Sequence, residues 1–348
     1  MNPYVLAILL SSLGLGTTLT FASSHWLLAW MGLEINTLAI IPLMAQHHHP
    51  RAVEATTKYF LTQATAAAMI MFASTTNAWA TGEWDMNDMS NPIASTMIIT
   101  ALALKIGLAP MHFWMPEVLQ GLDLMTGLIL STWQKLAPLA LIIQTAQAVD
   151  PMLLTALGIM STLVGGWGGL NQTQLRKVLA YSSIAHMGWM IIILQYAPQL
   201  TLLALGTYIF MTSAAFLTLK VSSATSISTL STVWSKSPIL TTTTALALLS
   251  LGGLPPLTGF MPKWLILQEL AKQNLPATAT IMALAALLSL YFYLRLCYAM
   301  TLTISPNTTN STTPWRIQTA QSSLPLALST TVALGFLPMT PAIMMLAT

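Results

Sequence analysis

The chain has 348 residues, of which only twelve are Lys or Arg and nine are Asp or Glu. Charged residues make up 6% of the sequence, against about 25% in a typical soluble domain, and hydrophobic residues make up 55%. The mean hydropathy is +0.70. This composition excludes a water-soluble enzyme, a nucleic-acid-binding protein and a disordered chain, and it predicts a polytopic membrane protein. The single cysteine, Cys297, excludes a disulfide framework and an iron–sulfur cluster held by this chain alone.

Eleven apolar runs are long enough to cross about 30 Å of hydrocarbon as helices of about 20 residues. Their residues are continuously apolar and do not alternate with polar ones, so we expect an all-α fold and no β-barrel. The two longest loops, 221–237 and 300–321, do not resemble separate domains, so a single domain over 1–348 is expected. The predicted spans are residues 3–21, 25–45, 58–80, 93–118, 124–146, 151–170, 176–196, 200–220, 238–271, 275–299 and 322–346.

Basic residues are divided unequally between the loops on the two predicted sides of the membrane. The loops after odd-numbered spans contain one, Lys272, together with the acidic residues Glu83, Asp85, Asp88 and Asp150. Short loops rich in Lys and Arg stay on the cytoplasmic or matrix side. The N-terminus is therefore predicted on that side, and the C-terminus on the opposite side. The basic residues of the loops after even-numbered spans are Arg51, Lys58, Arg176, Lys177, Lys220, Lys236, Arg295 and Arg316.

Four charged residues, Glu34, Lys105, Lys135 and Lys263, lie inside predicted spans. A charged side chain at a helix centre costs about 2.5–3.5 kcal/mol on insertion scales. We therefore expect these groups to face the protein interior, to pair, or to contact water, as in an ion or proton pathway. The alternative is a structural role, as a buried pair or as a Lys whose ammonium reaches the interface. Lys favours protonation chemistry, because a desolvated Lys releases its proton whereas Arg keeps it.

Two predicted spans contain prolines that would break their helices. The span at about 93–118 contains LKIGLAPMHFWMPE, and the span at about 238–271 contains SLGGLPPLTGFMPK. In both, two prolines stand six residues apart, and the two segments align at a spacing of 146 residues (110 with 256, 116 with 262). Each also carries an intramembrane Lys, Lys105 or Lys263. Since the broken spans are five spans apart, they enter the membrane from opposite sides, which predicts an inverted repeat.

Four stretches together resemble the NADH–ubiquinone oxidoreductase chain 2 family: LKIGLAPMHFWMPEVLQG, STWQKLAP, AYSSIAHMGWM and GGLPPLTGFMPKW. The resemblance covers essentially the whole chain. This mitochondrially encoded family supplies one of three antiporter-like subunits in the membrane arm of respiratory complex I. The resemblance implies a single antiporter-like transmembrane domain of two inverted five-helix repeats, each with a broken helix. It also implies the mitochondrial inner membrane, with the N-terminus in the matrix and the C-terminus in the intermembrane space.

The resemblance assigns a role to each intramembrane charge. Glu34 matches the family's carboxylate that pairs with the first channel lysine, and Lys105 matches that lysine. Lys135 matches the lysine of the central axis, and Lys263 matches the lysine near the exit half-channel. The four residues together are expected to form the proton pathway.

Histidines are further candidates, because their side chains titrate near neutral pH. His112 lies in the first predicted break and His186 in the seventh span. The resemblance favours relay roles for both, and the alternative is a hydrogen bond between helices. The run His47–His49 is not expected to bind a metal, because three successive side chains point in different directions and no Cys lies nearby.

The sequence contains no Gly-rich phosphate loop, no Ser–His–Asp set and no metal-binding constellation. We therefore expect no cofactor on this chain, and the resemblance implies that NADH, FMN, the iron–sulfur clusters and ubiquinone are used by other subunits. The expected partners are the neighbouring antiporter-like and small membrane-arm subunits and membrane lipid, with no nucleic acid. The expected function is proton translocation driven by electron transfer from NADH to ubiquinone. Two alternatives are a stand-alone cation/proton antiporter of the same fold and a structural spacer of the membrane arm.

Overall fold

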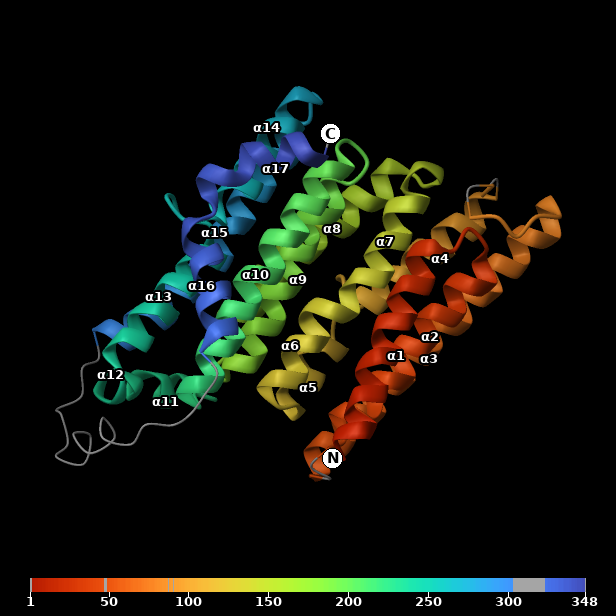
Figure 1. Cartoon of the computed structure of the whole chain (residues 1–348). Coiled ribbons are helices and arrows are strands. Elements are labelled where there is room, and N and C mark those ends of the chain that lie inside the picture. The colour runs from red at the N-terminus through yellow and green to blue at the C-terminus, as the bar shows by residue number, and fades with distance from the viewer. Residues whose placement is uncertain (1, 47–48, 87, 90, 303–322, 348) are drawn as a thin grey trace. The chain divides into compact units, whose positions relative to one another are not determined.

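The structure is a computed structural model that describes the chain except for residues 1, 47–48, 87, 90, 303–322 and 348. In this described part all regular elements are helices, and no strand is present. The chain divides into two compact units, Met1–Ser161 and Thr162–Thr348 (Figure 1). The prediction of one domain over 1–348 stays a prediction.

The first unit consists of helices that follow one another with short connections (Figure 1). The last of them, α8, contains the boundary between the units. The elements of the first unit are α1 (Pro3–Ala22), α2 (Trp26–Met44), α3 (Pro50–Thr81), α4 (Pro92–Ile106), α5 (Trp114–Gly121), α6 (Leu124–Thr132), η1 (Trp133–Lys135), α7 (Leu136–Thr145), η2 (Ala146–Ala148) and α8 (Pro151–Gly169).

The second unit is also helical. Two short helices follow α10, in the segment 221–237 that was predicted to be a loop. The elements of the second unit are α9 (Leu175–Ile193), α10 (Pro198–Ser222), α11 (Ile227–Ser231), α12 (Val233–Lys236), α13 (Pro238–Gly252), α14 (Phe260–Lys272), α15 (Pro276–Thr301), α16 (Leu324–Gly335), η5 (Leu337–Met339) and α17 (Thr340–Ala347).

Proline and asparagine fix where many of these helices begin. Proline is tolerated in the first helical turn because its missing N–H would have no partner there. Asn2 and Asn91 cap two helices by accepting hydrogen bonds from the N–H groups of Tyr4 (3.2 Å) and Ile93 (3.0 Å). The helices that begin with proline in this way are α1, α3, α4, α10, α13, α15 and α16.

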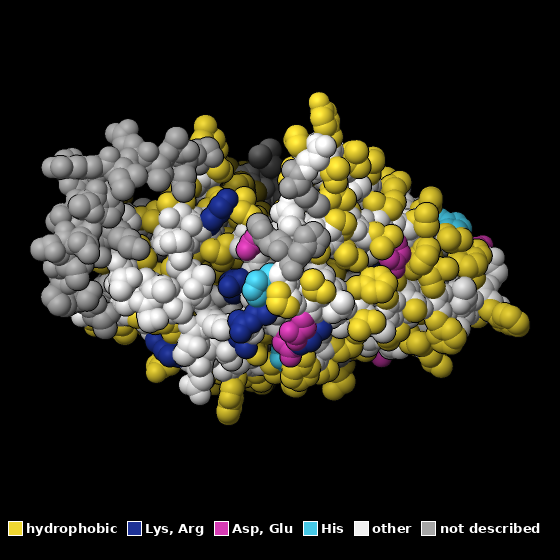
Figure 2. Space-filling model, turned by 90° about the horizontal axis from the view of Figure 1, so that it is seen from below, with side chains coloured by type: hydrophobic (Ala, Val, Ile, Leu, Met, Phe, Trp, Pro, Cys, Tyr) yellow, Lys and Arg dark blue, Asp and Glu magenta, His cyan; other side chains and the backbone are white. Residues whose placement is uncertain are grey.

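Six helical segments of the described residues are long and apolar enough to cross a membrane, or seven if a bent pair near the C-terminus counts as one. Hydrophobic side chains also cover most of the face in Figure 2, and charged ones occupy a small part of it. The prediction of an all-α membrane protein is confirmed, and the count of eleven spans stays a prediction. The six segments are α1, α2, Leu124–Ala148, α8, α10 and α15, and the shorter apolar helices are α4 and α13.

The first two helices pack very closely against each other. A Cβ atom added to Gly16 would lie 2.8 Å from the carbonyl oxygen of Gly32, and one added to Gly32 would lie 2.8 Å from that of Gly16. Small residues allow such backbone approach between membrane helices. This contact fixes α2, which carries Glu34, against α1.

The last predicted span, 322–346, is not one straight helix. The segments Leu324–Gly335 and Leu337–Met345 are bent by 70° relative to each other. Pro338 lacks the N–H that would bond the carbonyl of Leu334, so the α-helix cannot continue through this point. The loop predicted at 300–321 lies mostly outside the described residues.

Candidate functional site

The first predicted break separates α4 from α5. Gly107, at the end of α4, has a φ of +84°, which is accessible to glycine at little cost. The break leaves backbone carbonyls without helical partners. The indole Nε1 of Trp114 donates to the carbonyl of Leu104 (3.0 Å), and the amide Nε2 of Gln63 donates to that of Lys105 (3.4 Å). Neutral side chains therefore bind the open end of this helix.

The second break has the same backbone design but a charged partner. Gly253, with a φ of +79°, ends α13, and α13 has 15 residues, as α4 has. The ammonium Nζ of Lys263 donates to the carbonyl oxygens of Gly252 (2.8 Å) and Leu251 (3.4 Å). A positive charge is favourable at a helix C-terminus, where the dipole is negative. A Cβ atom on Gly253 would lie 2.9 Å from this Nζ, so glycine also makes room for the lysine.

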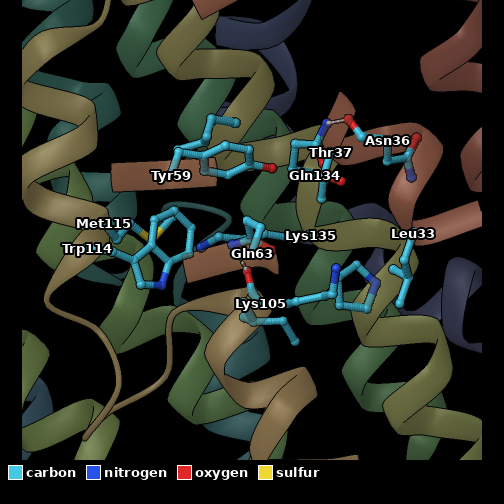
Figure 3. A pocket seen from close by; sticks show the side chains of 13 residues that line it. Leu33, Asn36, Thr37, Tyr59, Gln63, Lys105, Trp114, Met115, Gln134 and Lys135 are labelled. Atoms are coloured by element: carbon cyan, nitrogen blue, oxygen red, sulfur yellow. Dashed lines mark hydrogen bonds between the residues drawn. The ribbon is translucent and has the colours of Figure 1, made fainter. Parts of the chain in front are cut away.

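Lys105 and Lys135 line one cavity of the first unit (Figure 3). The two side chains are buried, at 5% and 2% exposure, and the cavity has a volume of about 10 Å³. That is about the space that one water molecule needs. Among the described residues, Nζ of Lys105 has no hydrogen-bond partner. The other polar side chains of the wall include Thr37, Tyr59, Gln63 and Gln134.

Lys135 lies in a 3₁₀ turn, η1, within the segment predicted as one span at 124–146. Pro138 has no N–H for the carbonyl of Gln134 four residues earlier, so the helix cannot keep its α hydrogen-bond pattern here. The Gln134 side chain instead turns toward α2, where its Nε2 donates to the backbone carbonyl of Asn36 (3.3 Å). This irregular turn holds Lys135 at the cavity.

Glu34 lies on α2, near Lys105. Its Oε2 accepts a hydrogen bond from the hydroxyl of Thr37 (3.0 Å), and its charge attracts that of Lys105. Within the described part of the chain no ion pair of 4.0 Å or less joins Glu34 to Lys105. The contact that the sequence predicted is therefore a longer-range attraction in this structure.

Lys263 and His186 line a second cavity, of about 20 Å³, in the second unit. Nδ1 of His186 donates to the carbonyl of Ser182 (2.7 Å), which fixes the ring on α9. The ring lies 5.5 Å from that of Tyr208 on α10. Two predicted site residues from distant parts of the sequence are thus brought together here.

His112 is placed differently. It lies in the turn between α4 and α5, where its Nδ1 donates to the carbonyl of Pro110 (3.3 Å) and its ring lies 4.4 Å from that of Phe113. It is not among the residues that line the two lysine cavities. Of the predicted histidine run, residues 47–48 lie outside the described residues, and the described part contains no group of three or more His, Cys, Asp or Glu able to hold a metal.

Of the side chains that line the first cavity, sequence reasoning predicted only Lys105 and Lys135, and it missed among others Tyr59, Gln63, Trp114 and Gln134. Gln63 is a polar residue in an apolar stretch of α3, and Gln134 directly precedes an intramembrane lysine. Both could therefore have been predicted from the sequence as candidate site residues. The aromatic rings of Tyr59 and Trp114 lie 5.7 Å apart, edge to face, and nothing in the sequence distinguishes them from packing residues. Chemically, both cavities place buried amines beside groups that can hold water and pass a proton.

Comparison with known proteins identifies two family models along the chain. Residues 23–289 match the model of the NADH:quinone oxidoreductase/Mrp antiporter transmembrane family, and residues 290–344 match that of the NADH dehydrogenase subunit 2 C-terminus. Proteins described as NADH-ubiquinone oxidoreductase chain 2 are similar over the full length. That of Carassius auratus is 85% identical and that of Danio rerio 78% identical, each over 100% of both chains.

Solved structures give the same result. A chain of respiratory complex I from Thermus thermophilus is 29% identical, with a TM-score of 0.86, over 98% of this chain and 79% of that one. A chain of the Mrp complex from Dietzia sp. matches with a TM-score of 0.82 at 13% identity, over 97% of this chain and 76% of that one, and this likeness concerns the fold alone. The resemblance seen in the sequence is confirmed, and the chain belongs to the NADH-ubiquinone oxidoreductase chain 2 family.

Proposed function

We propose that this chain is a proton-translocating subunit in the membrane arm of respiratory complex I. The observation that carries the proposal is the placement of Lys105 and Lys135, both buried, on one cavity of about one water's volume. Nζ of Lys105 has no hydrogen-bond partner among the described residues, and a buried amine of this kind can exchange a proton with water or with a neighbouring group. The family to which the chain belongs supports the same function.

In this mechanism protons enter from the matrix side, pass along Lys105 and Lys135, and leave past Lys263 toward the intermembrane space. Glu34 attracts the charge of Lys105, so any movement that changes their separation changes how strongly Lys105 holds its proton. The carbonyls of Gly252 and Leu251 stabilise the charged form of Lys263. His186 shares the cavity of Lys263 and acts there as a relay, and His112, in the turn between α4 and α5, is the second relay.

The proposed architecture is eleven helices arranged as two inverted five-helix repeats in one antiporter-like domain. Support comes from the equal lengths of α4 and α13 and from the glycines at 107 and 253, which end both helices with positive φ at the spacing of 146 residues. The proposed setting is the mitochondrial inner membrane, with the N-terminus in the matrix. The excess of Lys and Arg in the loops after even-numbered spans supports this orientation.

The partners in this proposal are other complex I subunits and membrane lipid. NADH, FMN, the iron–sulfur clusters and ubiquinone act in those other subunits, and this chain binds none of them. The two competing functions remain distinguishable. A stand-alone antiporter would move protons without NADH oxidation, and a structural spacer would need its lysines for assembly but not for proton transfer.

The test is Lys105→Met in assembled complex I in sealed vesicles, with proton uptake and NADH oxidation recorded together. Lys58→Met is the matched control, because Lys58 is 43% exposed, lies outside the cavity and pairs with Glu54 and Glu117. We expect proton uptake to fall several-fold in Lys105→Met and to stay normal in the control. Normal uptake in an assembled Lys105→Met complex would remove the support for this pathway.

A further inference from the structure

The second unit contains an apolar cavity whose described lining includes no lysine and no histidine. It has a volume of about 280 Å³ and lies between α10 and the bent pair α16–α17. Both α16 and α17 contact α10, and the last two helices are bent by 70° relative to each other (Figure 1). Its walls are built mainly from aliphatic and aromatic side chains such as Leu203, Phe210, Val332 and Ile343.

The polar groups of this cavity are already engaged. They are the hydroxyls of three threonines, Thr207, Thr258 and Thr340, and none of the described lining residues carries a charge. A hydroxyl has one proton to donate. Each donates it to a backbone carbonyl, those of Ala204 (3.0 Å), Ala333 and Leu337 (2.7 Å). The cavity therefore offers no hydrogen-bond donor to a polar ligand, and its chemistry selects hydrocarbon.

The mouth of the cavity opens at the exposed face of a membrane-crossing helix. Leu202 and Phe210, which line it, are 52% and 43% exposed and stand on α10, a helix long and apolar enough to cross the membrane. The medium at this surface is made of lipid acyl chains. Water does not fill an apolar hollow of this kind, and an empty one would lose its dispersion contacts.

We propose that this cavity binds one fatty-acyl chain of a membrane phospholipid. The bound chain packs against a wall shared with the pathway, because Thr207 lines both this cavity and that of Lys263 and His186. Thr258 lies in the turn between α13 and α14, so the chain also supports the second break. The proposal rests on the membrane setting of the proposed function and does not depend on proton transfer by the lysines.

The test uses a phosphatidylcholine with a diazirine in one acyl chain, incorporated into vesicles that contain the assembled complex. After irradiation, mass spectrometry locates the carbene adducts on this chain. We expect adducts on α10 and on α16–α17. Gly206 lines the cavity and has no atom within 4 Å of an added Cβ, so Gly206→Phe fills the space and should reduce these adducts at least fivefold.

The matched control is Gly14→Phe on α1, where an added Cβ also meets no atom within 4 Å, and it should leave the adducts on α10 unchanged. The proposal is overturned if wild type shows adducts on α1 but none on α10, α16 or α17, or if Gly206→Phe leaves them unchanged. Cross-links from this cavity to a neighbouring subunit, or displacement of the label by an isoprenoid quinone alone, would also overturn it. If Gly206→Phe fails to assemble, Gly206→Val is used with the same criterion.

Labelling and proton transfer are separate readouts. Intact labelling in a Lys105→Met complex with lost pumping would support both proposals. If wild type pumps protons normally but shows no carbene adducts on α10, α16 or α17, only the lipid-site proposal is overturned.

Discussion

Replacing Gly253 by Ala tests how the second broken helix holds its lysine. The added methyl group would lie 2.9 Å from both Cδ and Nζ of Lys263, so the end of this side chain must shift, which disturbs the contact of its ammonium with the carbonyl of Gly252, now 2.8 Å long. Gly107→Ala in the first break is the matched control. Its φ is nearly the same, +84° against +79°, but the nearest atom to an added Cβ is the sulfur of Met115, at 3.2 Å.

The difference between the two variants isolates the lysine contact. Forcing Ala into the left-handed region costs about 1–2 kcal/mol in both variants. A hydrogen bond to a charged group contributes about 1.5–3 kcal/mol, and this contact is disturbed only in Gly253→Ala. We therefore expect Gly253→Ala to be more destabilising than Gly107→Ala, by at most about 3 kcal/mol if the contact is lost completely.

The assay is thermal release of this subunit from the purified complex, followed on native gels for wild type and both variants. Gly253→Ala should release at a clearly lower temperature than Gly107→Ala. Equal release temperatures for the two variants would refute the interpretation that Lys263 contributes by binding the end of α13.

Three further predictions concern the helix packing and the charges outside the cavities. In Gly16→Leu the new side chain begins 2.8 Å from a backbone carbonyl of α2, an overpacking that costs about 1–3 kcal/mol, so less assembled complex should appear on native gels. Glu117→Gln removes the exposed ion pair with Lys58 (2.7 Å), and because solvent screens such pairs, scanning fluorimetry should find the melting temperature almost unchanged. The neighbouring Asp88 carboxylate raises the pKa of Glu83 above its usual range, because it accepts a hydrogen bond from the protonated Glu83 carboxyl and repels the ionised form. A raised carboxyl pKa stabilises the fold at low pH, and this stabilisation is lost as pH rises through the raised value. Limited proteolysis of the loop after α3 should therefore accelerate with pH, and Asp88→Asn should weaken this dependence, because Asp88 is the largest cause of the shift.

Much of the fold was predictable because the bilayer imposes strict rules on a sequence. Only helices and closed barrels satisfy their backbone groups in hydrocarbon, and the continuous apolar runs excluded barrels. The charged residues inside those runs identified Lys105, Lys135 and Lys263, which all proved to line small cavities. The prolines and glycines of the two broken segments likewise marked the ends of α4 and α13, since Gly107 and Gly253 adopt the backbone conformation that ends a helix.

Other features depend on contacts between residues far apart in the chain and could not be predicted from the sequence. The partners of Lys263 are backbone carbonyls, which carry no sequence signal. The position of Glu34 relative to Lys105 is set by how α2 packs, and hydropathy alone cannot report such a distance. Two irregularities have a local cause in the sequence, because a proline interrupts the helical hydrogen bonds just after each of them. These are the turn at Lys135 before Pro138 and the bend before Pro338.

The most direct test of the central claim is Lys135→Met in assembled complex I in sealed vesicles, with NADH oxidation and proton flux measured in the same sample. Met is an unbranched side chain only one atom shorter than Lys, and it cannot hold a proton. We predict normal assembly, with proton flux or coupled quinone reduction reduced several-fold. Normal assembly with both rates equal to wild type would contradict a proton path through Lys135 and would favour a structural role for the buried lysines.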